Sequence, residues 1–211
     1  MPRTGNLIIV SGPSGAGKSA IASLVLKRLP GLCFSISYTT RAPRANERDG
    51  VDYFFVGKGE FESLIRSGNL LEWAEVYGNL YGTAGRFIDE QLAKGDDVLL
   101  DIDVQGARSI RGLRPGAITV FILPPSYQVL RRRLENRKLD KDYVIEHRLR
   151  IARQEIAQYR SYDYLIINEE LETAVEDLRA IILGSRCRIA MRSGDAESIV
   201  ATFGGLDAKD P

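Results

Sequence analysis

The sequence predicts an α/β fold in which a parallel sheet is flanked by helices and one α+β lobe is inserted into the core. Three observations predict it. Short apolar runs rich in Val and Ile recur along the chain, as is typical of strands buried on both faces of a sheet. Amphipathic helical patterns separate these runs, and this alternation indicates a doubly wound core. Residues 35–83 break the alternation and are therefore expected to form the lobe.

Each apolar run predicts one strand of the core. The four runs are LIIV (7–10), VLLDI (98–102), ITVFIL (118–123) and YLII (164–167). Helical periodicity is present between and after them, in residues 20–29, 87–95, 126–137, 142–159 and 172–184. These elements assign residues 1–34 and 84–190 to the core. The remaining residues, 191–211, lack a strong periodic face and are expected to be a partly ordered C-terminal tail.

The inserted lobe is predicted to consist of short strands and turns around one small helix. The helical pattern lies near EFESLIRSG, residues 60–68. A pair of strands that turns at Gly78-Asn79 is then predicted by LLEWAEVYGNLYG, residues 70–82, because Gly and Asn favour tight turns.

Composition limits the compartment and the partners. The chain has 211 residues, with 29 Lys and Arg against 28 Asp and Glu, so it lacks the overall basic field expected of a nucleic-acid-binding protein. The N-terminal apolar run is too short for a signal-peptide core or a membrane span. Cys33 and Cys187 lie far apart without metal-ligand spacing, which favours two thiols in a reducing compartment. We therefore expect a cytoplasmic protein with no nucleic-acid or membrane partner, and the oligomeric state stays open.

A phosphate-binding loop follows the first apolar run. The sequence GPSGAGKS and the helical pattern after it fit G-x-x-x-x-G-K-[ST] in the strand–loop–helix setting that gives this motif its meaning. The glycines allow close approach of the backbone, so that N–H groups and the helix N-terminus point at phosphate oxygens. Lys18 is spaced to reach the β- and γ-phosphates, and the Ser19 hydroxyl to bind Mg²⁺. The predicted site for a nucleoside triphosphate consists of Gly12, Pro13, Ser14, Gly15, Ala16, Gly17, Lys18 and Ser19.

The stretch SISYTTRAPRANERDGVDYFF, residues 35–55, is rich in hydroxyl and arginine side chains. Its apolar residues alternate too weakly for a well-buried strand. Two interpretations follow: a polar surface hairpin, or a site that holds a small phosphorylated molecule.

Several motifs together resemble one family. The order and spacing found in guanylate kinases are matched, from about Leu7 to about Leu183, by GPSGAGKS, SISYTTRAPR, DYFF, LLEWAEVYGNLYGT and LLDIDVQG. The resemblance implies a phosphate-loop NTPase core, an inserted nucleoside-monophosphate-binding lobe and a helical lid at about 132–150. It also implies an enzyme that transfers the γ-phosphoryl group of ATP to GMP, and to dGMP, with Mg²⁺.

The resemblance assigns the acceptor phosphate to two arginines and two tyrosine hydroxyls, namely Arg41, Arg44, Tyr53 and Tyr81. Cations are needed there because two anions must approach each other, and the planar fork of arginine suits phosphate oxygens. Pro43, between the arginines, stiffens the turn. The alternative for the arginines is a solvated surface pair.

Glu72 matches the carboxylate that reads guanine in the family. A carboxylate accepts both adjacent guanine donors, N1–H and the exocyclic amino group, whereas adenine presents a repelling lone pair at N1. Ser37 and Thr83 match hydroxyl positions that contact O6 and its neighbours. The alternative for Glu72 is an exposed acid on a hairpin.

Two carboxylates follow a predicted strand. Asp101 and Asp103 are two residues apart and so share one face at the end of the strand, where ligands are expected. Asp101 resembles the carboxylate that binds Mg²⁺ together with Ser19, directly or through water. Asp103 resembles one that faces the acceptor nucleoside, and its alternative role is to cap the following helix. No general base is required, because the attacking phosphate oxygen is already ionised.

The segment 131–160 carries ten Lys and Arg against five Asp and Glu. The resemblance implies lid arginines that converge on the transferred phosphoryl group, namely Arg133, Arg137 and Arg148. The catalytic residues that it implies are Lys18, Arg41, Arg137 and Arg148. It adds Arg133 and Asn168 to the ATP-binding residues, with Asn168 near the adenine. Lys138 stands where many members have glycine, at the lid hinge.

Three other functions are alternatives to this one. A ribose bisphosphate kinase has a similar core but no need for a guanine reader such as Glu72. A non-catalytic guanylate-kinase-like interaction module would lose the chemistry of Lys18, Ser19 and Asp101, which this chain keeps. RNA binding through the basic segment lacks interleaved aromatic residues and an overall positive charge.

Overall fold

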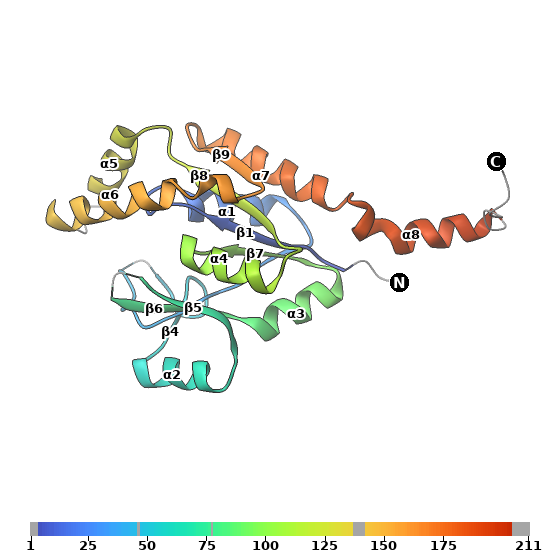
Figure 1. Cartoon of the computed structure of the whole chain (residues 1–211), viewed down its shortest axis with the longest axis horizontal. Coiled ribbons are helices and arrows are strands. Elements are labelled where there is room, and N and C mark those ends of the chain that lie inside the picture. Colours follow the sequence, from blue (N-terminus) through green and yellow to red (C-terminus); the bar gives the residue numbers. More distant parts are fainter. Residues whose placement is uncertain (1–3, 46, 77, 137–141, 204–211) are drawn as a thin grey trace.

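The computed structural model describes residues 4–45, 47–76, 78–136 and 142–203 (Figure 1). Its central sheet has five strands in the order β2-β7-β1-β8-β9, and every pairing is parallel. The strands are β1 (Leu7–Ser11), β2 (Leu32–Phe34), β7 (Asp97–Asp101), β8 (Ile118–Leu123) and β9 (Tyr164–Ile167). The four strands predicted from apolar runs are confirmed. The short strand β2 was not predicted.

Helices cover both faces of this sheet, because successive side chains of its buried strands point in opposite directions. Ile8 lies on the face that packs against α1 (Lys18–Arg28) and α7 (Leu171–Ser185). Ile9 lies on the face that packs against α3 (Gly85–Lys94) and α4 (Val104–Leu113). Both isoleucines are fully buried. The apolar runs are therefore continuous because both faces of the strands are covered, as predicted from the sequence.

A second sheet of four strands lies beside the first, in the order β4-β3-β6-β5. Its elements are β3 (Tyr38–Thr39), β4 (Phe54–Phe55), α2 (Lys58–Arg66), β5 (Leu70–Val76) and β6 (Asn79–Ala84). The predicted hairpin is confirmed, and Gly78 in its turn has a φ of 76°. Phe61 of α2 is fully buried, and a Cβ atom on Gly82 would lie 3.0 Å from its ring, so a larger residue at 82 would require this packing to shift.

Two further helices, α5 (Tyr127–Glu135) and α6 (Asp142–Ile156), pack against each other. Their shared apolar cluster consists of Leu130, Leu134, Ile145, Leu149 and Ala152. These helices contain the predicted lid residues Arg133 and Arg148. Arg137 and Lys138 lie outside the described residues.

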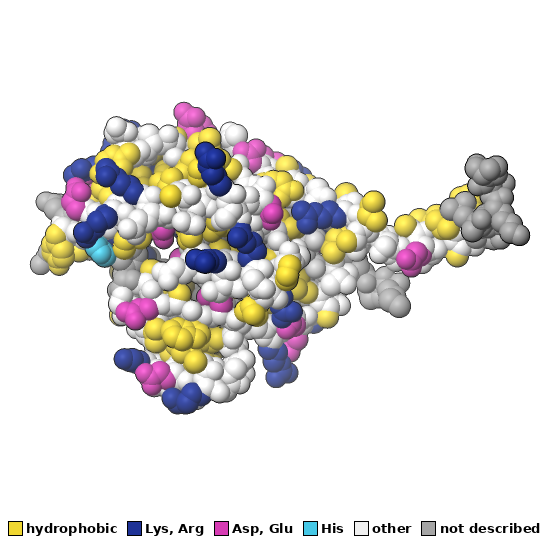
Figure 2. Space-filling view, viewed as in Figure 1, with side chains coloured by type: hydrophobic (Ala, Val, Ile, Leu, Met, Phe, Trp, Pro, Cys, Tyr) yellow, Lys and Arg dark blue, Asp and Glu magenta, His cyan; other side chains and the backbone are white. Residues whose placement is uncertain are grey.

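The C-terminal part of the chain contains a helix, α8 (Ile189–Thr202), that extends away from the body (Figure 1). None of its residues is buried, and Figure 2 shows hydrophobic side chains along it. Basic and acidic side chains are interspersed on the face drawn in Figure 2. Among the described residues, no helix is both long and apolar enough to cross a bilayer.

Candidate functional site

The carboxyl ends of the central strands position one side of the site. β1 ends at Ser11 and leads into the phosphate loop, while its neighbour β7 ends at Asp101, the register partner of Val10. The four-stranded sheet supplies the other side. Between them lies a cavity of about 1230 Å³. This volume exceeds the roughly 300–1,000 Å³ of a typical small-molecule pocket, so the cavity is large enough for two nucleotides.

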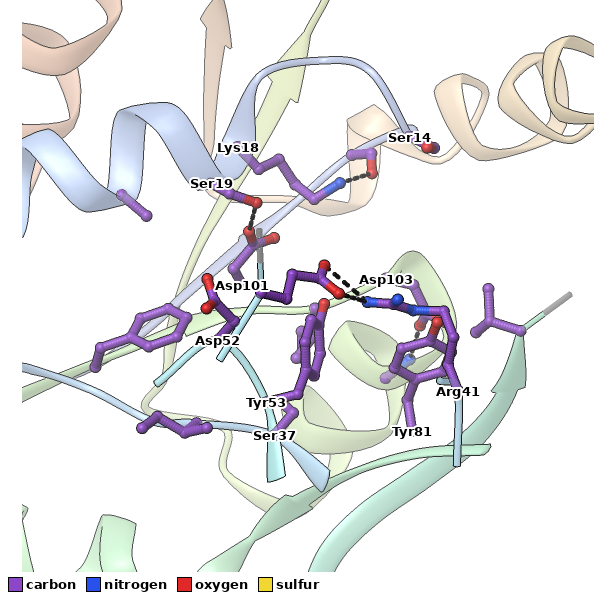
Figure 3. A pocket seen from close by; sticks show the side chains of 18 of the residues that line it. Ser14, Lys18, Ser19, Ser37, Arg41, Asp52, Tyr53, Tyr81, Asp101 and Asp103 are labelled. Carbon is purple, nitrogen blue, oxygen red and sulfur yellow. Dashed lines mark hydrogen bonds and ion pairs between the residues drawn. The ribbon is translucent and has the colours of Figure 1, made fainter. Parts of the chain in front are cut away.

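Most of the predicted site residues line this one cavity (Figure 3). From the core they are Gly12, Ser14, Gly15, Gly17, Lys18, Ser19, Asp101, Asp103 and Arg148. From the four-stranded sheet and its loops they are Ser37, Arg41, Arg44, Glu72, Tyr53 and Tyr81. The cavity thus unites segments that are far apart in the sequence. The predicted site residues that are described but do not line it are Pro13, Ala16, Thr83, Arg133 and Asn168.

The phosphate loop has a positive φ at three glycines, and Gly12 and Gly17 show its consequences most directly. Gly12 has a φ of 139°, and a Cβ atom there would lie 2.3 Å from the carbonyl oxygen of Ile122. Gly17 has a φ of 97° and caps the start of α1. Lys18 Nζ folds back over the loop and donates to the carbonyl oxygens of Gly12 at 2.6 Å and Pro13 at 3.3 Å. The ammonium group is therefore held beside the part of the loop backbone that would bind a phosphate.

Asn168 and Arg133, predicted as ATP-binding residues, contact the backbone of the phosphate loop. Asn168 is 4% exposed, and its Nδ2 donates to the carbonyl oxygen of Ala16 at 2.7 Å. Arg133 Nη2 donates to the carbonyl oxygen of Asn168 at 2.9 Å, and its Nη1 to that of Ala16 at 3.4 Å. The two side chains thus brace the loop from outside the cavity. A direct contact with ATP stays a prediction for both.

Ser19 and Asp101 form a pair of oxygen ligands. Ser19 Oγ donates to Asp101 Oδ2 at 2.7 Å, and both side chains line the cavity (Figure 3). A hydroxyl and a carboxylate suit the hard ion Mg²⁺, which commonly takes one or two protein oxygens and completes its shell with phosphate and water. Among the described residues, no group of three or more His, Cys, Asp and Glu could hold a metal by itself. The donor set therefore fits Mg²⁺ bound together with a nucleotide.

The predicted acceptor-phosphate residues lie together on the side of the four-stranded sheet. The guanidinium carbon of Arg41 is 5.5 Å from the centre of the Tyr53 ring, and the rings of Tyr53 and Tyr81 meet edge to face at 5.9 Å. Burial raises the pKa of Tyr53, and the negative charge of Asp101 raises it further by a smaller amount. The hydroxyl therefore remains a neutral donor. These residues form a group of hydrogen-bond donors suited to an anion.

Glu47 lies among these donors as an acceptor, and its role was not predicted from the sequence. Both of its carboxylate oxygens accept from Arg41 Nη2 at 2.9 Å, and Oε2 accepts from the backbone N–H of Arg44 at 2.8 Å. The alternative of a solvated surface pair is wrong for Arg41, whose side chain is 16% exposed. Arg44 is more exposed, at 41%. The only local signal was an acid three residues after Arg44, and its importance depends on the turn that brings the two residues together.

Glu72 is buried at the base of the cavity. It is 8% exposed, so the alternative of an exposed acid on a hairpin is wrong. The hydroxyl of Thr83, itself fully buried, donates to Glu72 Oε1 at 2.6 Å. Burial raises the pKa of Glu72 to about 7, Asp103 adds to the rise, and the hydrogen bond from Thr83 opposes it. Glu72 therefore changes its charge near neutral pH, before any ligand donates to it.

Asp103 caps α4 while it also lines the cavity. Its Oδ1 accepts from the backbone N–H of Gly106 at 2.7 Å. Burial raises the pKa of Asp103, against the effect of this hydrogen bond. A Cβ atom on Gly106 would lie 3.0 Å from Glu72 Oε2, so α4 begins directly against the buried glutamate. The capping role is therefore observed, and a contact with the acceptor nucleoside stays a prediction.

Comparison with known proteins gives the family. The guanylate kinase family model matches residues 4–184, which is most of the chain. The chain belongs to the guanylate kinase family. A guanylate kinase of Geobacter metallireducens is 47% identical over 188 residues, which cover 89% of this chain and 93% of that relative. A guanylate kinase of Carboxydothermus hydrogenoformans is 48% identical, over 87% of this chain and 90% of the relative.

The fold agrees with the family. A crystal structure of guanylate kinase from Anaplasma phagocytophilum superposes with a TM-score of 0.81 at 32% identity, covering 96% of this chain and 97% of that one. The family and the α/β phosphate-loop fold predicted from the sequence are thus confirmed. Both cysteines, Cys33 and Cys187, are free thiols.

Helix α6 contributes two charged side chains to the cavity of this guanylate kinase family member. Arg148 was predicted, and Glu155, seven residues later on the same helix face, was not. Glu155 Oε2 is buried and accepts no hydrogen bond from the described residues. Burial raises the pKa of Glu155, while Lys18 opposes this rise and Asp103 adds to it. The seven-residue spacing from Arg148 was the available sequence signal.

Proposed function

We propose that this chain is an ATP:GMP phosphotransferase that converts ATP and GMP, and also dGMP, to ADP and the corresponding nucleoside diphosphate. The observation that carries the proposal is the buried carboxylate of Glu72, which accepts a hydrogen bond from Thr83 and lines the same cavity as the phosphate loop. Family membership supports it, since the relatives are guanylate kinases along nearly their whole length. The domain assignment that goes with it is a core of residues 1–34 and 84–190 with an acceptor lobe of residues 35–83.

The donor triphosphate is proposed to bind at the phosphate loop. Backbone N–H groups of the loop and the start of α1 offer donors to the phosphate oxygens. Lys18 exchanges its present acceptors, the carbonyl oxygens of Gly12 and Pro13, for β- and γ-phosphate oxygens. Ser19 and Asp101 would hold Mg²⁺, which supplies positive charge that neutralises the phosphates.

The acceptor phosphate is proposed to bind Arg41 and Arg44, with hydroxyl donors from Tyr53 and Tyr81, while Ser37 is kept for O6 of the base. Two anions approach each other in this reaction, so the arginines lower the repulsion between them. An oxygen of the acceptor phosphate is the nucleophile and is already ionised. The protein therefore contributes positioning and charge neutralisation and has no need for a general base.

Guanine is proposed to bind Glu72 in its ionised form. The carboxylate then accepts from N1–H and from the exocyclic amino group, and both donors stabilise the charge. A pKa near 7 in the free protein means that guanine binding favours loss of the proton. Adenine places an acceptor where N1–H would be, so the carboxylate disfavours it. Asp103 faces the nucleoside with the oxygen that the helix cap leaves available.

Closure of α5 and α6 over the cavity is proposed to complete the site. It would move Arg148 towards the transferred phosphoryl group. Arg133 would have to release the carbonyl oxygens of Ala16 and Asn168 to follow. The role of Arg137, outside the described residues, stays a prediction. Closure also excludes water, which suppresses hydrolysis of ATP. A cytoplasmic location and the absence of nucleic-acid and membrane partners stay predictions from the sequence.

A coupled assay of ADP release tests the proposal with GMP, dGMP, AMP, CMP, UMP and ribose 1,5-bisphosphate as acceptors. We expect GMP and dGMP to be used with far higher kcat/KM than the others. Faster turnover of ribose 1,5-bisphosphate would favour the bisphosphate kinase alternative. Lack of turnover with every acceptor, in protein that binds GMP, would favour the interaction module.

A further inference from the structure

A carboxylate lies among the residues that bind the acceptor phosphate in the proposed function. Glu47 accepts from Arg41 Nη2 with both oxygens and from the backbone N–H of Arg44, and its Oε1 is 3.5 Å from Arg44 Nη1. Its side chain is only 16% exposed, as is that of Arg41. An acid would be expected to weaken a phosphate site, so its position there needs an explanation.

The backbone fixes Glu47 in place. Its own N–H donates to the carbonyl oxygen of Arg44 at 3.0 Å, while its carboxylate accepts from the N–H of the same residue. Two hydrogen bonds, one in each direction, thereby join Arg44 and Glu47, directly after Pro43. A carboxylate held by the main chain in this way is not a freely swinging group that leaves when a phosphate arrives.

The arginines, in contrast, depend on Glu47 for their arrangement. Two guanidinium groups that converge on one spot repel each other, and the repulsion grows as water is excluded. A carboxylate between them removes this cost. Arg41 is also held by the carbonyl oxygen of Ala42 at 2.7 Å and lies over the rings of Tyr53 and Phe55. A guanidinium has five N–H donors, so donors of Arg41 remain for a phosphate.

We propose that Glu47 is the positioning residue of the acceptor-phosphate site: its carboxylate holds Arg41 and Arg44 side by side before GMP arrives. The inference rests on the proposed function and extends it. GMP then binds to a preformed pair of cations. The conformational entropy of the two long side chains is lost when the protein folds and not when GMP binds. The opposite role, a carboxylate that competes with the phosphate for Arg41, predicts the opposite effect of its removal.

Steady-state kinetics of Glu47→Gln test the proposal. Glutamine keeps the size and a carbonyl acceptor for the N–H of Arg44 but removes the charge that balances the arginines. We expect KM for GMP to rise at least about tenfold, while kcat and KM for ATP stay within about threefold of the wild type. Because only phosphate recognition is lost, kcat/KM should fall equally for GMP and AMP, and the preference for GMP should be kept.

The matched control is Glu62→Gln, which removes an exposed charge from α2 beside the same sheet and should leave all constants unchanged. An unchanged or lower KM for GMP in Glu47→Gln overturns the positioning role, and a lower value identifies a competitor. A loss of base preference along with the rise in KM also overturns it, because a collapsed lobe then explains the result. Wild-type protein that uses no GMP overturns the proposed function itself and this inference with it.

Discussion

Replacement of Glu72 by glutamine tests the proposed reading of guanine. In the structure Oε1 accepts from the hydroxyl of Thr83 at 2.6 Å, and Oε2 lies against the start of α4. Glutamine can keep the bond from Thr83 through its carbonyl oxygen. Its NH₂ group then replaces the second acceptor and meets one of the two guanine donors.

The magnitude follows from the bonds that change. One hydrogen bond to a charged group, worth about 1.5–3 kcal/mol, is lost, and the remaining bond becomes a weaker neutral one. Two opposed donors add a desolvation cost. The total of about 2–5 kcal/mol corresponds to a fall of about 30-fold to several thousand-fold in kcat/KM for GMP. KM for ATP should change little, because Glu72 is remote from the phosphate loop in the sequence and faces the acceptor side of the cavity.

The free energy of unfolding of Glu72→Gln should rise, although its kcat/KM for GMP falls. Burial raises the pKa of Glu72 from 4.5 to about 7, so the folded state binds this proton more tightly than the unfolded state. The stabilisation from protonation is fully present below the unfolded pKa and is lost as the pH rises through about 7. At pH 8 the buried charge therefore destabilises the wild type, and Glu72→Gln should raise its free energy of unfolding by about 1–3 kcal/mol.

The assay compares kcat/KM for GMP and AMP between pH 5.5 and 8.5. In the wild type, the ratio of kcat/KM for GMP to kcat/KM for AMP should increase as Glu72 ionises near pH 7. The variant should show no such rise. AMP corrects for titration of the acceptor phosphate. Glu75→Gln on the same strand, where the side chain is exposed, is the matched control. If Glu72→Gln keeps the full preference for GMP over AMP, the guanine reader lies elsewhere.

Three further outcomes are expected. Lys18→Ala should lower kcat by orders of magnitude with little change in thermal stability, and near-normal turnover would refute its role at the transferred phosphoryl group. Arg186→Met should reduce the free energy of unfolding by about 3–5 kcal/mol, because Arg186 Nε donates to the fully buried Asp97 at 2.7 Å. Arg179→Met, in an exposed pair on α7, the helix that Arg186 follows as the C-cap, should cost less than about 1 kcal/mol, and equal losses would contradict this account. Small-angle scattering should show a smaller radius of gyration with GMP and an ATP analogue than without ligands, and an unchanged radius would argue against closure.

Local sequence patterns were sufficient to predict most strands and helices of the core. The apolar runs at 7–10 and 164–167 predicted strands because buried parallel strands need continuous apolar side chains. The phosphate loop was predicted from residue spacing, because its geometry depends on adjacent residues. Strand β2 was missed since its three residues, Leu32–Phe34, form no run. Helix α4 was not among the predicted helices because Gly106 and Gly112 lower its helix propensity.

The sequence was insufficient where a role depends on distant partners. Glu155 enters the cavity only because α6 lies across it, and Glu47 matters only because its turn closes on Arg44. Asn168 was predicted near adenine, but its burial and its bond to Ala16 arise from the end of β9 meeting the phosphate loop. Such contacts bring together residues that no local pattern connects.

The contact between Gly17 and Asn168 limits how the donor site can evolve. A Cβ atom on residue 17 would lie 2.2 Å from Asn168 Nδ2, the atom that also bonds the carbonyl oxygen of Ala16. Room for a side chain at 17 thus requires a smaller residue at 168, and that residue would leave Ala16 without its bond. The φ of 97° disfavours a side chain at 17 in any case, so a mutant library randomised at 17 should return glycine even when 168 is varied with it. Of the two positions, only 168 is open to substitution while its neighbour is kept.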